Sequence, residues 1–79
     1  MNAYLTPAQI RVFRTVIRGF SNREAASHLH VEPKTVAKQM GEVQRVYGVK
    51  SRSKLFALFV DHHKVEESIA AHAKPKGKA

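Results

Sequence analysis

Two helical patterns separated by only three residues constrain the fold of this chain more than any other feature. Start and stop signals predict one helix over Asn22–Leu29 and a longer one over Pro33–Tyr47, so that only residues 30–32 lie between them. Two helices joined by such a short turn must cross at a steep angle, which is the helix-turn-helix arrangement. In that arrangement the second helix can enter the major groove of DNA.

The boundaries of both helices follow from local chemistry. Ser21 and Asn22 are good N-cap residues, because their side-chain oxygens can accept hydrogen bonds from unpaired backbone N–H groups one turn into the helix. Glu32 is a poor cap, but Pro33 suits a first helical position, where its missing N–H is no loss. Gly48 is a natural end for the second helix.

The second helix is amphipathic. Its apolar residues recur at steps of four, three and four, which places them on one face: Val36, Met40, Val43 and Tyr47. The opposite face carries Lys34, Lys38 and Arg45, with Gly41 between them. A helix with one apolar face and an opposite cationic face suits insertion into a DNA groove. The alternative is a charged face that is merely solvated.

A first helix is expected to begin at Thr6-Pro7 and to end near Gly19, with an apolar side formed by Ile10, Phe13, Val16, Ile17 and Phe20. Another side carries Arg11, Arg14 and Arg18, which either contact phosphate or are solvated. In the next helix Arg23 occupies the first turn, where the helix dipole disfavours a cation. A phosphate could hold it there, or it could simply be exposed.

A fourth helix is expected after Ser51, a plausible N-cap. It contains six consecutive apolar residues, 55–60, which is more than one apolar stripe needs. We interpret the excess as a self-association surface formed by Leu55, Phe56, Phe59 and Val60. The alternative is a fourth helix that is buried from two sides within the chain.

The fold class is therefore expected to be all-α, a small four-helix helix-turn-helix domain over residues 1–60. Val65 and Ile69, four residues apart, predict a helical extension within residues 61–73. Residues 74–79 are basic and have nothing to bury, which predicts a disordered tail. Such a tail either adds sequence-independent attraction to DNA or only improves solubility.

Composition restricts the classes of function that this chain could have. The net charge of +8 attracts polyanions, of which nucleic acid is the commonest soluble kind and a membrane surface the rival. No apolar run is long enough to span a membrane, no signal peptide is evident and there is no Cys, so a cytoplasmic, nucleoid-associated protein is expected. The pairs His28/His30 and His62/His63 lack metal-ligand spacing on a helix. No nucleophile set or phosphate loop is present, so we expect no metal, no cofactor and no enzymatic activity.

The chain resembles the DNA-binding domain of LuxR-type (GerE-like) transcription regulators over Leu5 to about Leu58. The resemblance is carried, in this order, by Leu5-Thr6-Pro7-Ala8-Gln9, Gly19-Phe20-Ser21-Asn22-Arg23-Glu24-Ala25-Ala26, Leu29, Val31, Thr35-Val36, Tyr47-Gly48-Val49 and Ser51-Arg52. It implies four helices, with the third as the recognition helix and the fourth often used for dimerisation. Most members carry a receiver or ligand-binding domain first, and this chain is expected to be a stand-alone member.

Departures from the family pattern affect the expected base contacts. Ala25 replaces a usual Ile. Where the family favours a basic residue, a variable residue and then His, this chain has Ala37, Lys38 and Gln39, and Gly41 stands at another frequent base-reading position. The base-reading positions are thus Lys38, Gln39, Ala37 and Gly41, with Lys38 and Gln39 left to contact base edges. Phosphate contacts are expected from Asn22, Arg23, Lys34, Thr35 and Arg45.

The leading hypothesis is a homodimeric DNA-binding transcription regulator that inserts the helix Pro33–Tyr47 into the major groove of double-stranded DNA. A different class, suggested by Ala37, Gly41 and the apolar fourth helix, is a protein-interaction module that docks on another regulator or on RNA polymerase. A third, suggested by the charge and the lysine-rich end, is a nonspecific nucleoid-coating protein. No membrane partner is expected.

Overall fold

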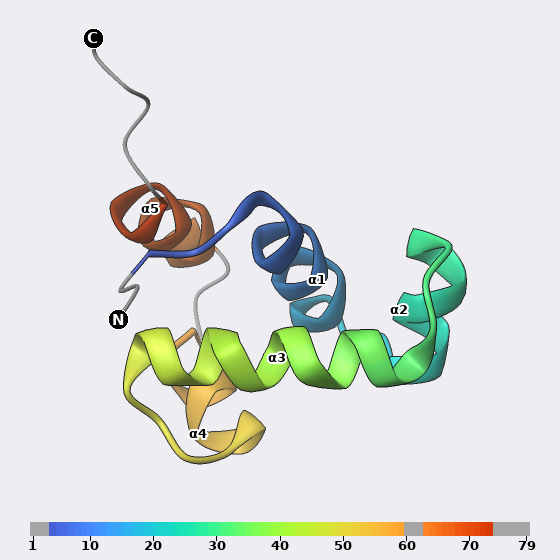
Figure 1. Cartoon of the computed structure of the whole chain (residues 1–79). Helices are drawn as coiled ribbons and strands as arrows, with labels where there is room; N and C mark the ends of the chain where they lie inside the picture. Colours follow the sequence, from blue (N-terminus) through green and yellow to red (C-terminus); the bar gives the residue numbers. More distant parts are fainter. Residues whose placement is uncertain (1–3, 60–62, 74–79) are drawn as a thin grey trace, which may run out of the picture.

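The computed structural model describes residues 4–59 and 63–73, and within these it is all-α (Figure 1). Five helices follow one another: α1 (Pro7–Ile17), α2 (Asn22–Leu29), α3 (Pro33–Tyr47), α4 (Arg52–Ala57) and α5 (His63–His72). The long α3 crosses the molecule, with α1 on one side, α2 at its start and α4 folded back beneath its C-terminal half (Figure 1). The predicted bounds of α2 and α3 are confirmed. Val60, His62 and the basic tail 74–79 lie outside the described residues.

Capping explains where α1 and α2 begin. The Thr6 hydroxyl accepts from the Gln9 backbone N–H at 3.2 Å, and the Gln9 amide oxygen accepts from the Thr6 N–H at 2.9 Å. Ser21 and Glu24 form the same reciprocal pair at 3.1 and 2.8 Å. Each box satisfies two backbone donors that a helix start leaves unpaired. Ser21 is therefore the cap of α2, and Asn22 is its first helical residue.

The turn between α2 and α3 is short because α2 ends abruptly. His30 adopts a left-handed conformation (φ 60°), and the Val31 N–H donates to the Ala26 carbonyl at 3.0 Å. Such an end reverses the chain within one residue. Ala25 and Ala26 are fully buried, and their small side chains allow close packing of α2 on α3. The helix-turn-helix is thus set by local signals.

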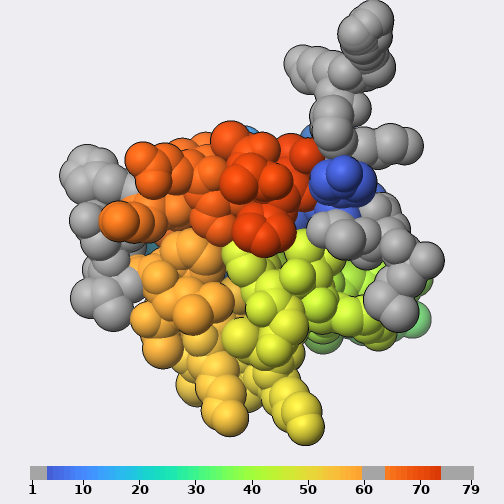
Figure 2. Space-filling view, turned by 90° about the vertical axis from the view of Figure 1, so that its left-hand side faces the viewer, coloured from blue at the N-terminus to red at the C-terminus, as the bar shows by residue number. Residues whose placement is uncertain are grey.

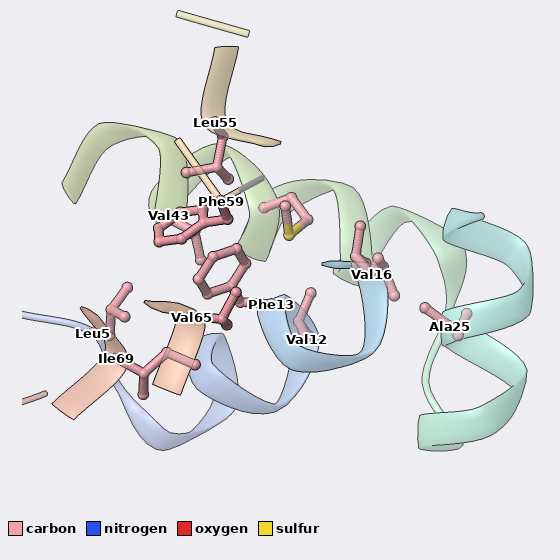
Figure 3. Packing of buried hydrophobic residues seen from close by; sticks show 13 residues of the cluster. Leu5, Val12, Phe13, Val16, Ala25, Val43, Leu55, Phe59, Val65 and Ile69 are labelled. Carbon is pink, nitrogen blue, oxygen red and sulfur yellow. The ribbon is translucent and has the colours of Figure 1, made fainter. Parts of the chain in front are cut away.

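The core is one cluster that all five helices share (Figure 3). Phe13 of α1 lies at its centre, with its ring 5.7 Å from that of Tyr47 and 5.5 Å from that of Phe59. The back of α3 contributes three fully buried residues, Val36, Met40 and Val43, as the apolar period predicts. Burial at this level contributes about 1.5–3 kcal/mol per large apolar side chain, so α3 is held firmly by its back.

The predicted extension is a distinct helix that completes this core. Val65 and Ile69, on one face of α5, are buried in the same cluster as Phe13 and Leu5. The Leu5 N–H donates to the His72 carbonyl at 2.7 Å, and Leu5 pairs with Ala73 in an isolated parallel bridge. Figure 2 shows α5, in red and orange, lying across the end of α3. Backbone hydrogen bonding therefore holds the start of the described chain against its end.

Polar contacts also connect α5 to α1 and α3. The Arg14 guanidinium donates to both carboxylate oxygens of Glu66, at 2.9 and 2.7 Å. The Tyr47 hydroxyl lies 2.8 Å from the Ser68 hydroxyl, and the Tyr47 ring lies 4.5 Å from that of His72. Burial raises the pKa of the Tyr47 phenol above its ordinary value, and the hydrogen bond with Ser68 only partly opposes this shift.

The apolar run in α4 is explained differently from our expectation. Leu55 is 0% exposed and Phe59 is 7% exposed within this single chain, so neither faces a second subunit, and that part of the dimerisation prediction is wrong for this structure. The reason is that both side chains are buried in the shared core cluster of the chain itself, together with Phe13. Phe56 is half-buried, whereas Leu58, which the prediction omitted, is 54% exposed.

Candidate nucleic-acid interface

One face of α3 is free of contacts with the core, and we call it the α3 outer face: Lys34, Ala37, Lys38, Gly41 and Arg45. All five residues are exposed. Successive residues turn by about 100° around an α-helix, so these positions form one strip opposite the buried back. The sequence pattern predicted this face correctly. Its ends carry Lys34 and Arg45, and its middle carries Lys38 between Ala37 and Gly41, which have little or no side chain.

The charge on the α3 outer face is almost uncompensated. Within residues 4–59 and 63–73, neither Lys38 nor Arg45 forms a salt bridge. Lys34 is 3.8 Å from Glu32, but both side chains are largely exposed, and such a pair contributes little. The one acidic residue of α3, Glu42, accepts a hydrogen bond from the Gln9 amide at 2.7 Å and thereby links α3 to α1. The face therefore presents positive charge to solvent.

Thr35 and Gln39 lie on a flank of α3 rather than on its outer face. Both are half-buried, and both line a small hollow of about 110 Å³ together with Arg11 and Val31. Gln39 is about 100° around the helix from Lys38. Of the two side chains expected to contact bases, Lys38 points outward and Gln39 points toward α1.

Gly41 leaves open space on the α3 outer face. A methyl group built at this position would meet no atom within 4 Å, and the residue has ordinary helical geometry. Within the described part of the chain, no packing contact therefore accounts for the glycine. A flat backbone surface here would allow close approach of another molecule.

The start of α2 carries the other predicted phosphate contacts. Arg23 is exposed, whereas Asn22 is half-buried and accepts a hydrogen bond from the Arg52 guanidinium, with 2.6 Å between Nη2 and Oδ1. This bond joins the first residues of α2 and α4. The sequence analysis did not single out Arg52 as a site residue, because thirty residues separate it from Asn22 and no local pattern links them.

Comparison with protein families decides which helix-turn-helix this is. Residues 3–59 match the family model described as "Bacterial regulatory proteins, luxR family". The chain belongs to this family. It is accordingly a DNA-binding regulator of the helix-turn-helix type. A search of curated proteins and a search of solved structures each gave no match. The matched segment of this LuxR-family chain ends at Phe59, so α5 follows it.

The three arginines on α1 are not equivalent in this LuxR-family domain. Arg14 is engaged by Glu66, and this pair lowers the pKa of the Glu66 carboxyl through the hydrogen bond and the charge of the guanidinium. Arg14 is therefore occupied on the side of α1 that faces α5. Arg11 and Arg18 are exposed and form no salt bridge among the described residues.

Other site chemistries find no support in the part of the chain that the structure describes. No group of three or more His, Asp or Glu side chains could hold a metal ion there. Nor does any helix in those ranges have the length and apolar character needed to cross a membrane. The α3 outer face of this LuxR-family chain is cationic and also carries two small residues, Ala37 and Gly41.

Proposed function

We propose that this LuxR-family chain regulates transcription by inserting α3 into the major groove of double-stranded DNA. The observation that carries the proposal is the α3 outer face, where the exposed cations Lys34, Lys38 and Arg45 alternate with the small residues Ala37 and Gly41. A helix that presents its backbone so closely can lie deep in a groove about 12 Å wide. Its buried back keeps the face rigid while it does so.

Within this proposal the contacts divide into two kinds. Lys38 reads base edges, because it is the outward side chain at the centre of the α3 outer face, and Lys on guanine is a common pairing. Ala37 and Gly41 let the helix approach, and Gln39 contributes from the flank. Phosphates are held by Asn22, Arg23, Lys34, Thr35 and Arg45. With a single strong base reader, specificity is modest and depends in part on DNA shape.

The first experiment is selection from random duplexes at near-physiological salt, followed by titration of the selected site and of a random duplex. Lys38→Ala should cost roughly 1–3 kcal/mol at the selected site while changing random-DNA binding little. Lys64→Ala on α5 removes the same charge from an exposed position and serves as the control. Equal losses on both duplexes would show that Lys38 does not read bases.

The same selection tests whether recognition is specific at all. A chain that only coats DNA would give no enriched sequence and no binding that survives an excess of random competitor. That result would remove the regulatory proposal and leave a nonspecific nucleoid protein. An enriched sequence would support binding at particular sites on DNA.

We also propose that two copies pair on DNA. The exposed side chain of Leu58, at the C-terminal end of α4, supports a contact there after Leu55 and Phe59 are assigned to the core. A symmetric pair would contact half-sites about 34–36 Å apart, one helical turn of DNA. The selected sequence should then be an inverted repeat with that spacing.

A further inference from the structure

Arg52 is a half-buried cation with no acidic partner among the described residues. Neither salt bridge found there involves it, and its one side-chain hydrogen bond goes to the neutral Asn22. A guanidinium has five N–H donors, so most of its donors have no partner in this contact. Removing part of a cation from water without an opposite charge costs free energy, which an external anion could recover.

The contact also fixes which way the Asn22 amide faces. Arginine can only donate hydrogen bonds, so the atom that faces it must be the amide oxygen. The amide NH₂ of Asn22 therefore points away from Arg52. This orientation follows from the chemistry of the pair and does not depend on telling nitrogen from oxygen by position. Asn22 thus presents donors, not an acceptor, to whatever approaches.

We propose that Arg52 and Asn22 together form one seat for a DNA phosphate, in which Arg52 donates directly and also holds the Asn22 amide in its donating orientation. This inference rests on the proposed DNA-binding function and adds Arg52 to its contacts. A phosphodiester fits the pair because its two non-bridging oxygens accept hydrogen bonds and carry the missing negative charge. Exposed Arg23, next to Asn22, adds charge to the same place.

The placement of the pair agrees with this role. The 2.6 Å bond brings the first turn of α4 to the first turn of α2, the helix that packs most extensively on α3. In Figure 1 both turns lie along the lower side of α3. A protein that inserts α3 would carry this seat against the backbone beside the groove. Phosphate contacts of this kind set the register of a helix on DNA.

The decisive variant is Asn22→Asp. An aspartate keeps an oxygen facing Arg52 and adds an ion pair, so the fold should unfold at the same temperature as wild type or higher. The donor NH₂ is lost, however, and a negative charge takes its place. We expect DNA affinity to fall at least tenfold for selected and random duplexes alike. Ala70→Asp is the control for the change in charge, because Ala70 is exposed on α5, which lies above α3 in Figure 1. This control variant should lose much less DNA affinity.

The second variant is Arg52→Gln, which can still donate to Asn22 but has no charge. Affinity for both duplexes should fall roughly tenfold, and the slope of log K against log salt should lose about 0.9, as for one phosphate contact. Arg52→Lys should restore the slope and only part of the affinity, because it lacks the planar fork. A purely structural Arg52 would leave the slope unchanged.

The outcomes separate the two ideas. If wild type binds no duplex, both the proposed function and this inference fail. If wild type binds, while Asn22→Asp loses no more affinity than Ala70→Asp and Arg52→Gln keeps the wild-type salt slope, the phosphate seat is wrong and the function stands.

Discussion

Replacing Gly41 by alanine should make this protein more stable. Gly41 is the ninth of the fifteen residues of α3, well inside the helix, and a methyl group there would touch nothing within 4 Å. Glycine in a helix interior is less favourable than alanine by about 0.8–1.0 kcal/mol, because it loses more backbone freedom on folding. No strain or collision in the described residues offsets this gain.

The expected size follows from the length of the chain. For a domain of 60–100 residues, 1 kcal/mol corresponds to about 4–8 °C in the midpoint of thermal unfolding. Gly41→Ala should therefore raise the midpoint by roughly 3–8 °C, measured by far-ultraviolet circular dichroism. Ala37→Gly, the reverse exchange on the same exposed face, should lower it by a similar amount. A midpoint that falls for Gly41→Ala would refute this account of α3.

A second pair of variants tests what the α3 outer face contacts. Gly41→Glu and Gly41→Gln place side chains of nearly equal shape in the same open space, and both residues are good helix formers. Both should raise the unfolding midpoint. Either side chain fills the space that Gly41 leaves for close approach, so both variants should bind DNA more weakly than wild type, and the glutamate, which also brings a negative charge, should bind much more weakly than the glutamine. Wild-type DNA affinity in both variants would show that this face does not meet the phosphate backbone or the groove.

The remaining predictions concern α5 and α4. Ile69→Ala should destabilise the fold by about 2–5 kcal/mol, because it empties a buried site, while leaving the salt dependence of DNA binding unchanged. The Arg14–Glu66 pair is largely exposed, so Glu66→Gln should cost less than about 1 kcal/mol. Folding lowers the pKa of Glu66 below its ordinary 4.5, so the contribution of this pair to stability is present above that pH and is lost as the pH falls below it. The denaturation curves of wild type and Glu66→Gln should therefore approach each other as the pH is lowered. Leu58→Glu should weaken the proposed pairing of two copies, measured by sedimentation, without changing the unfolding midpoint.

The helix-turn-helix could be predicted from sequence because every signal that defines it is local. Ser21 begins α2, Pro33 begins α3 and Gly48 ends it, each through contacts that span no more than a few residues. The outer face of α3 was predictable for the same reason, since a period of 3.6 residues fixes which side chains share a side. These inferences need no knowledge of what packs where.

The contacts that were missed all connect distant parts of the chain. The bond between Arg52 and Asn22 spans 30 residues, and the pair Arg14–Glu66 spans 52. Neither contact produces a periodic pattern in the sequence, because a hydrogen bond between two side chains requires only that the fold bring them together. Gln39 is expected to read bases because it stands at a family position often held by His, whereas in the structure it lies on a flank of α3 and lines a hollow together with Arg11 of α1.

The apolar run in α4 shows a limit of another kind. A surplus of apolar residues indicates that a surface must be buried, but it does not indicate whether the same chain or another one buries it. Here the chain covers these residues itself, because Leu55 and Phe59 are buried in the same cluster as Phe13, Val65 and Ile69. In Figure 1 α5 lies above α3 and α4 lies below it, and the α3 outer face stays exposed. A single copy can therefore be fully folded before it meets DNA, so the proposed pairing at Leu58 should add affinity on an inverted repeat rather than stability to the fold.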